Sequence, residues 1–348
     1  MLLNPTQFKY AALALRPDIK GLDFGEYTLK SGRASAYFWN AGNLMKTGEG
    51  ASMSGEIYAE LVVLGRKKGD DPDFLMGPAM KGIAIGAITA DELAGHGIYK
   101  RFGFDIKETE GYEVMEWSEI LGGKKVNIDD EFVVDEIPLD GKAAMDLGKE
   151  LSEKFSGKKF DVILAQSYGG IVPAVLIVKH LYEDHKENKR FVYNRIALKK
   201  YADLKERLIV GDVEDGDVAI VVKSKEEPEG PIVGDLRKGD VVSQTEDVMT
   251  TAKTKIVTWE KLCSYRSGLK PGGIYLGLNR QEVTPDGEDP IEVLNEIGFS
   301  IYSALNARDV MTTFHRVPIE EGKEPPVTDD IMKSFIMHNA NFGSKRVE

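Results

Sequence analysis

Apolar positions along the chain follow two spacings, one typical of helices and one typical of buried strands. Apolar residues three and four apart predict helices over residues 50–68 and over Ala143–Phe155. Two stretches, Phe74–Ala87 and Phe160–Pro173, each read as a continuous apolar strand, a glycine-rich loop and the start of a helix. Since strands alternate with helices, we expect an α/β protein with a parallel sheet.

The two strand-loop-helix stretches differ in chemistry. The first carries Lys81 in its loop, whereas the second has Gly170 beside the corresponding place. An acidic loop at Val134–Ala143 likewise has Pro138 and Leu139 where hydroxyl residues would face a phosphate. We interpret residues from about 113 to 215 as a degenerate internal repeat or an inserted α/β module. The loss of the loop lysine and of these hydroxyl residues favours a structural or dimer-forming purpose over a second active site.

Length and composition narrow the class of protein. A chain of 348 residues predicts two domains, or one domain with a large insertion. The net charge of −12 argues against nucleic acid or a membrane surface as a partner, because both are polyanions. No apolar run reaches the roughly 18 residues that a membrane-spanning helix needs. The single cysteine, Cys263, excludes an intramolecular disulfide and favours a cytoplasmic location.

The candidate chemistry centres on the stretch Glu246–Thr254. It follows a β-prone run, Asp240–Thr245, and precedes a helical pattern, Ile256–Leu262. Loop amides, threonine hydroxyls and a helix N-terminus can together surround a phosphate. The adjacent carboxylates of Glu246 and Asp247 can hold ribose hydroxyls or lie near a metal ion. An ordinary acidic turn with a threonine cap is the alternative.

A second candidate surface is the predicted hairpin over residues 24–40. Its turn carries Lys30 and Arg33, and its second strand carries Phe38 and Trp39. Cations beside aromatic faces suit a flat anionic ring. A plain amphipathic hairpin with its aromatics in the core would show the same pattern.

Four motifs, in order, resemble those of orotate phosphoribosyltransferases, which are type I phosphoribosyltransferases. They cover about residues 20–105 and 215–315. The resemblance implies a central parallel sheet flanked by helices, with a small hood, plus the inserted or duplicated α/β module. It implies four segments: 1–112 and 216–316 for the two halves of the core, 113–215 for the module and 317–348 for a tail that wraps the surface. The motifs are Thr28–Arg33, Gly77–Ile83, Glu246–Thr254 and Asn279–Glu282.

The resemblance also implies an activity: transfer of 5-phosphoribosyl from phosphoribosyl pyrophosphate (PRPP) to orotate, with Mg²⁺, in a cytoplasmic homodimer. The implied catalytic residues are Lys81, Lys225, Glu246 and Asp247. The implied PRPP-binding residues are Lys81, Lys223, Lys225, Glu246, Asp247, Thr250, Thr251, Ala252, Lys253 and Thr254. The implied orotate-binding residues are Lys30, Phe38, Trp39, Thr250 and Arg280.

The chain departs from the family pattern at several of these positions. Glu246 replaces the first aspartate of the PRPP loop, and Ala252 and Lys253 stand where glycine and threonine are usual. Asn279 replaces an aspartate, and the hood stretch has lysines but no histidine. Two alternatives therefore stay open: a phosphoribosyltransferase for another base, and a non-catalytic relative that binds PRPP or nucleotides.

Overall fold

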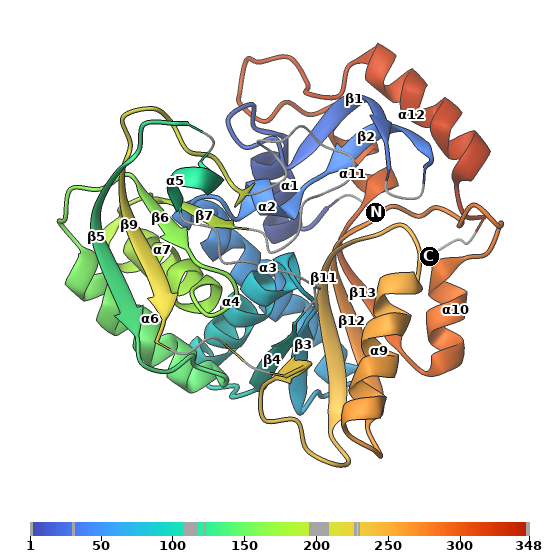
Figure 1. Cartoon of the computed structure of the whole chain (residues 1–348). Coiled ribbons are helices and arrows are strands. Elements are labelled where there is room, and N and C mark those ends of the chain that lie inside the picture. Colours follow the sequence, from blue (N-terminus) through green and yellow to red (C-terminus); the bar gives the residue numbers. More distant parts are fainter. Residues whose placement is uncertain are drawn as a thin grey trace.

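The structure, a computed structural model, describes residues 3–29, 32–106, 117–121, 123–194, 209–225, 228 and 230–345. Its strands form a six-stranded sheet, a five-stranded sheet and a separate two-stranded hairpin. Helices lie between the two large sheets, with α3 and α4 from one side packed on α6 and α7 from the other (Figure 1). The predicted α/β class, with an additional α/β module, is confirmed.

The six-stranded sheet has the order β10-β4-β3-β11-β12-β13. Neighbouring strands of this sheet run parallel, as predicted, except at one edge. There the short strand β10 runs antiparallel to β4, so the sheet is mixed. The carboxyl ends of β3, β11 and β12 meet at one edge, where open α/β sheets bind ligands. The bounds are β3 (Phe74–Gly77), β4 (Arg101–Asp105), β10 (Ile232–Val233), β11 (Val241–Met249), β12 (Lys270–Asn279) and β13 (Ser300–Asn306).

The five-stranded sheet has the order β5-β9-β6-β7-β8. It contains β9, whereas we predicted that the second half of the core begins at residue 216. The structure places β9 in the second sheet instead, where it pairs with β5 on one side and β6 on the other and its apolar side chains are buried. The bounds are β5 (Asn127–Val134), β6 (Val162–Ala165), β7 (Arg190–Asn194), β8 (Ile209–Val210) and β9 (Val218–Ser224).

The strongly periodic helices occur where the apolar spacing predicts them. For example, α3 covers the predicted 50–68 stretch and begins at a cap in which Thr47 Oγ1 accepts from the Gly50 amide. The helices are α1 (Pro5–Leu15), α2 (Ala41–Leu44), α3 (Gly48–Lys67), α4 (Lys81–Gly95), α5 (Trp117–Ile120), α6 (Gly141–Phe155), α7 (Ile171–His185), α9 (Lys253–Tyr265), α10 (Pro290–Ile297), α11 (Ala307–Phe314) and α12 (Asp329–Phe342).

The C-terminal helix α12 was not predicted. It lies on the hairpin formed by β1 (Leu22–Thr28) and β2 (Ala34–Trp39), and the two are seen together in Figure 1. Only Phe335 and His338 of this helix are buried. Because so narrow an apolar face gives a weak periodic signal, the sequence predicted only a tail wrapped on the surface.

A buried charged cluster lies where α4 and α7 meet. Lys179 Nζ is 2.7 Å from Asp91 Oδ2, and the two side chains are 2% and 1% exposed. His180 lies beside them, with Nε2 3.0 Å from Asp91 and Nδ1 2.9 Å from Asp184. Burial disfavours the charged imidazole, but the hydrogen bond and charge of Asp91 outweigh it. The pKa of His180 is therefore raised above its ordinary value.

Replacing His180 by glutamine is expected to remove a pH-dependent part of the stability. Because the folded-state pKa is raised, charged His180 stabilises the fold fully below the unfolded value of about 6.5. That stabilisation is lost as the pH rises through the folded-state value. The difference in unfolding free energy between wild type and H180Q, measured in urea over a pH series, should shrink in that window. A difference that does not vary with pH would contradict this, and H96Q, at an exposed histidine, is the matched control.

Candidate functional site

One ion pair marks the carboxyl edge of the six-stranded sheet. Lys81, at the start of α4, places Nζ 2.9 Å from Oδ2 of Asp247 on β11. The side chains are 21% and 16% exposed, so the pair is accessible from outside. Burial disfavours the Asp247 carboxylate, but the charge of Lys81 outweighs it and the pKa of Asp247 is lowered. At neutral pH the Asp247 carboxylate is therefore charged.

The loop before Lys81 is held tightly. The Ala79 amide donates to Asp105 Oδ1 at 2.7 Å, which ties the loop to the end of β4. A Cβ atom on Gly77 would lie 2.2 Å from the carbonyl oxygen of Gly82, so no larger residue fits there. The glycines of this loop thus fix the position from which the Lys81 side chain extends.

The two adjacent carboxylates do not act as a pair. We predicted a strand that ends in the two carboxylates, but β11 continues beyond them to Met249. Successive side chains of a strand point to opposite faces. Asp247 therefore faces Lys81, while Glu246 Oε1 lies 3.4 Å from Nζ of the buried Lys255 on α9.

The stretch predicted to hold a phosphate joins β11 to α9. Thr250 and Thr251 are half-buried, Ala252 is buried, and Lys253 and Thr254 are exposed in the first turn of the helix. This is the predicted arrangement of a strand, a short loop and a helix N-terminus. Ala252 is the N-cap residue of α9, and its methyl side chain cannot accept a hydrogen bond from the first amides of the helix.

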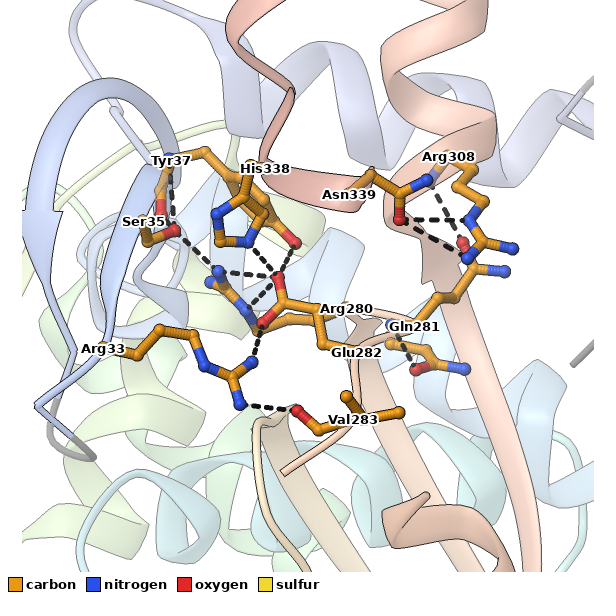
Figure 2. Close-up of polar contacts among 11 residues, drawn as sticks. Arg33, Ser35, Tyr37, Arg280, Gln281, Glu282, Val283, Arg308, His338 and Asn339 are labelled. Carbon is orange, nitrogen blue, oxygen red and sulfur yellow. Dashed lines mark hydrogen bonds and ion pairs between the residues drawn. The ribbon is translucent and has the colours of Figure 1, made fainter. Parts of the chain in front are cut away.

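Arg280 follows β12 and is almost fully buried. Its guanidinium donates to Ser35 Oγ at 2.7 Å and to Glu282 at 3.1 Å, and lies 4.0 Å from the centre of the Tyr37 ring. Figure 2 shows these groups converging from β2 and from the segment that follows β12. The arginine predicted to bind the orotate carboxylate thus already faces a carboxylate of the protein.

Glu282 is the centre of this cluster. Besides Arg280, it accepts from Arg33 Nη1 at 3.0 Å, from the Tyr37 hydroxyl at 2.9 Å and from His338 Nε2 at 2.8 Å (Figure 2). Burial disfavours the charged carboxylate, but these donors outweigh it and the pKa of Glu282 is lowered to about 2. Glu282 therefore joins the hairpin, the end of β12 and the C-terminal helix.

The predicted hairpin residues have different surroundings. Phe38 is half-buried against Tyr27, with ring centres 5.4 Å apart. Trp39 is 2% exposed and packs in the core beside Tyr10. The aromatic residue that meets Arg280 is Tyr37. Lys30 lies outside the described residues.

The two lysines predicted for the hood lie in the other sheet. Lys223 is in β9, and its Nζ is 2.5 Å from Glu131 of β5. Lys225 follows the same strand, with Nζ 3.4 Å from the exposed Asp135. Both neutralise acidic residues of their own sheet, and the structure does not bring them together with Lys81.

Sequence reasoning missed Tyr37, Glu282 and His338 as parts of one cluster. Glu282 stands inside one of the quoted motifs and Tyr37 inside the predicted hairpin, so the signal was present there without their partners. His338 had no signal, because its helix was not predicted.

Other features of the described residues do not mark a second candidate site. A surface hollow of about 440 Å³ lies at the amino ends of β6 and β9, lined partly by Lys158, Asp161 and Lys189. That edge is opposite to the one where α/β sheets bind ligands. Within the described ranges, no three of His, Cys, Asp and Glu gather to hold a metal ion by themselves. None of the described helices has the length and apolar character that crossing a bilayer requires.

Comparison with known proteins identifies relatives for part of the chain. No protein-family model matches. Orotate phosphoribosyltransferase of Enterobacter sp. (strain 638) is 47% identical over 94 residues, which are 27% of this chain and 41% of that protein. The enzyme of Marinobacter nauticus is 38% identical over 132 residues, which are 37% of this chain and 58% of that protein. The chain thus spans about half the length of the curated relatives it matches.

Among solved structures, orotate phosphoribosyltransferase of Francisella tularensis is 16% identical, with 97% of this chain and 100% of that chain covered. Its TM-score of 0.43 is too low to establish a shared fold. The local sequence identity of 38 to 47% is therefore what relates the proteins. Over the matched stretch this chain is similar in sequence to the orotate phosphoribosyltransferases, as its motifs indicated.

Proposed function

We propose that this protein transfers the 5-phosphoribosyl group of PRPP to orotate, giving orotidine 5′-phosphate and pyrophosphate. One observation carries the proposal: the Lys81–Asp247 ion pair at the carboxyl edge of the sheet, beside the loop that starts α9. The local identity to orotate phosphoribosyltransferases supports the same reaction.

The roles follow from charge and position. Lys81 meets the diphosphate, whose negative charge grows as it leaves. Asp247 accepts from the ribose hydroxyls and stabilises the positive charge that develops on the sugar. Thr250, Thr251 and Thr254, with the first amides of α9, surround the 5′-phosphate. Because Lys81 and Asp247 are paired in the free protein, PRPP must replace their mutual contact with its own.

The reaction exchanges one bond for another at the ribose C1 carbon. The bond to the pyrophosphate oxygen breaks as a ring nitrogen of orotate forms the new bond and gives up its proton. The protein contributes alignment of the two substrates and neutralisation of charge, which lower the barrier without covalent catalysis.

Mg²⁺ is proposed as the cofactor. This ion is usually held by one or two carboxylates together with substrate phosphates and water. Asp247, a partly exposed carboxylate at the site, fits that donor set. When bound, the ion supplies further neutralisation of the diphosphate. A cytoplasmic location stays a prediction from the single cysteine.

One observation favours the second candidate function, which is binding of PRPP without transfer of its phosphoribosyl group to orotate. Arg280 is buried and already engaged by Glu282 and Ser35. For orotate to bind there, its carboxylate must replace Glu282 or share the guanidinium with it.

The deciding experiment follows the absorbance of orotate after mixing with PRPP, Mg²⁺ and the protein. We expect the absorbance to fall and pyrophosphate to appear in equal amount. Turnover of another purine or pyrimidine base in a parallel panel would redirect the proposal to that base. Calorimetric binding of PRPP with no turnover of any base would select the binding protein instead.

A further inference from the structure

The two large sheets contain the same unit twice. In the first, β3 is flanked by β4 and β11, and β10 runs antiparallel at the edge. In the second, β6 is flanked by β7 and β9, and β8 runs antiparallel at the edge. The registers agree as well: Phe74 pairs with Arg101 and Val242, and the equivalent Val162 pairs with Arg190 and Ala219. The repeat suspected from the sequence thus includes β7, β8 and β9.

Two hydrogen bonds in the loop of the first unit have direct counterparts in the second. The Ala79 amide donates to Asp105 at 2.7 Å, and the equivalent Ser167 amide donates to Asn194 at 2.6 Å. The Gly82 amide donates to the Pro78 carbonyl at 3.1 Å, as Gly170 does to Gln166 at 2.7 Å. These pairs establish that α7 follows β6 in the same way as α4 follows β3.

Contacts between the two units are also reciprocal. The Gly48 amide, at the start of α3, donates to the Lys189 carbonyl at 3.0 Å, and the Gly141 amide, at the start of α6, donates to Lys100 at 2.9 Å. Isolated antiparallel bridges join Thr47 to Arg190 and Arg101 to Asp140. Likewise, α3 packs on α7, and α6 packs on α4. In a two-fold interface, each contact from the first partner to the second is repeated from the second to the first. The contacts between these two units follow that pattern.

The charges at the centre of this interface are not equivalent. By the same register, Lys179 of α7 corresponds to Asp91 of α4, and these two residues form the buried ion pair. Two copies of the first unit would place Asp91 against Asp91, and two copies of the second would place Lys179 against Lys179. Burying like charges is strongly unfavourable, so the interface fits only unlike halves.

The second unit has also lost the ion pair of the candidate site. Gly169 stands where Lys81 stands in the first unit, and Ser224 stands where Asp247 does. A Cβ atom on Gly169 would lie 1.8 Å from Ser224 Oγ, so the loop is closed onto the strand. One unit thus carries the candidate chemistry and the other packs against it.

We propose that residues 127–224 are a built-in partner, which covers in the same chain the face that a second subunit would otherwise cover. The homodimer that the family resemblance implies is replaced at this face by pairing within one chain. This inference rests on the reciprocal contacts and does not depend on the proposed function.

The test uses paired cysteines in full-length protein with Cys263 replaced by serine. T47C/R190C and R101C/D140C each place cysteines at one of the two reciprocal bridges. Bridged Cα atoms lie about 4.5–5.5 Å apart, within the range of a disulfide. After oxidation in dilute solution, we expect both variants to lose their thiols and to run as single chains of 38.5 kDa on a non-reducing gel.

The outcomes distinguish a contact within one chain from a contact between two chains. A disulfide-linked species of twice that mass as the main product would overturn the proposal, and so would free thiols in both variants. Mixing the T47C and R190C single variants should give no cross-linked dimer. If one cysteine pair prevents folding, the other pair, at the reciprocal bridge, still decides.

Discussion

Asparagine in place of Asp247 is expected to lower kcat/KM for phosphoribosyl transfer about 100-fold or more. Removing one preorganised electrostatic group from an active site costs on the order of 10²–10³ in rate. Asp247 is the only one of the two adjacent carboxylates that faces Lys81 and the outside, so the loss falls on ribose binding and on the charge of the transition state. Initial rates of orotate consumption at several PRPP concentrations measure it.

The fold should tolerate this change. Asparagine has nearly the same shape, and the Lys81 left behind is 21% exposed and remains hydrated. We expect the melting temperature of D247N to stay close to that of wild type. D286N makes the same chemical change at an exposed position and should keep full activity. Wild-type turnover in D247N would remove this carboxylate from the mechanism.

Glutamine in place of Glu282 is expected to lower the free energy of unfolding by about 3.5 kcal/mol. The pKa is lowered from 4.5 to about 2 in the folded protein, and each unit corresponds to about 1.4 kcal/mol. Removing one partner of a buried ion pair costs a similar amount, because Arg280 and Arg33 would stay buried without their anion. Urea unfolding at pH 7 measures the difference.

The pH dependence gives this prediction a second readout. A carboxylate with a lowered pKa stabilises the fold above its unfolded value of 4.5, and the stabilisation is lost as the pH falls toward 2. Wild type and E282Q should therefore converge over that window. E288Q, at an exposed glutamate of the neighbouring loop, should match wild type throughout. A constant gap between wild type and E282Q down to pH 2 would mean that packing, not charge, is what Glu282 supplies.

Some of the site was predictable from short stretches of sequence. The glycine loop before Lys81 and the loop between β11 and α9 are local features, formed by consecutive residues with strong backbone preferences. Their side-by-side placement also followed, because parallel strands bring their carboxyl ends to one edge. The direction of each side chain did not follow: a shift of one residue in the register of β11 decides whether Glu246 or Asp247 faces Lys81.

The sequence by itself determined the α/β class, most helices and strands and the glycine loops, since apolar spacing and turn residues act over a few neighbouring positions. Only the tertiary structure decided that Glu282 neutralises Arg280, that β9 belongs to the second sheet, and that Asp91 meets Lys179. The physical reason is that a buried charge is paired with a group that is close in space, which can be far away along the sequence. Asp91 and Lys179 come from different helices, and nothing in either local stretch indicates the other.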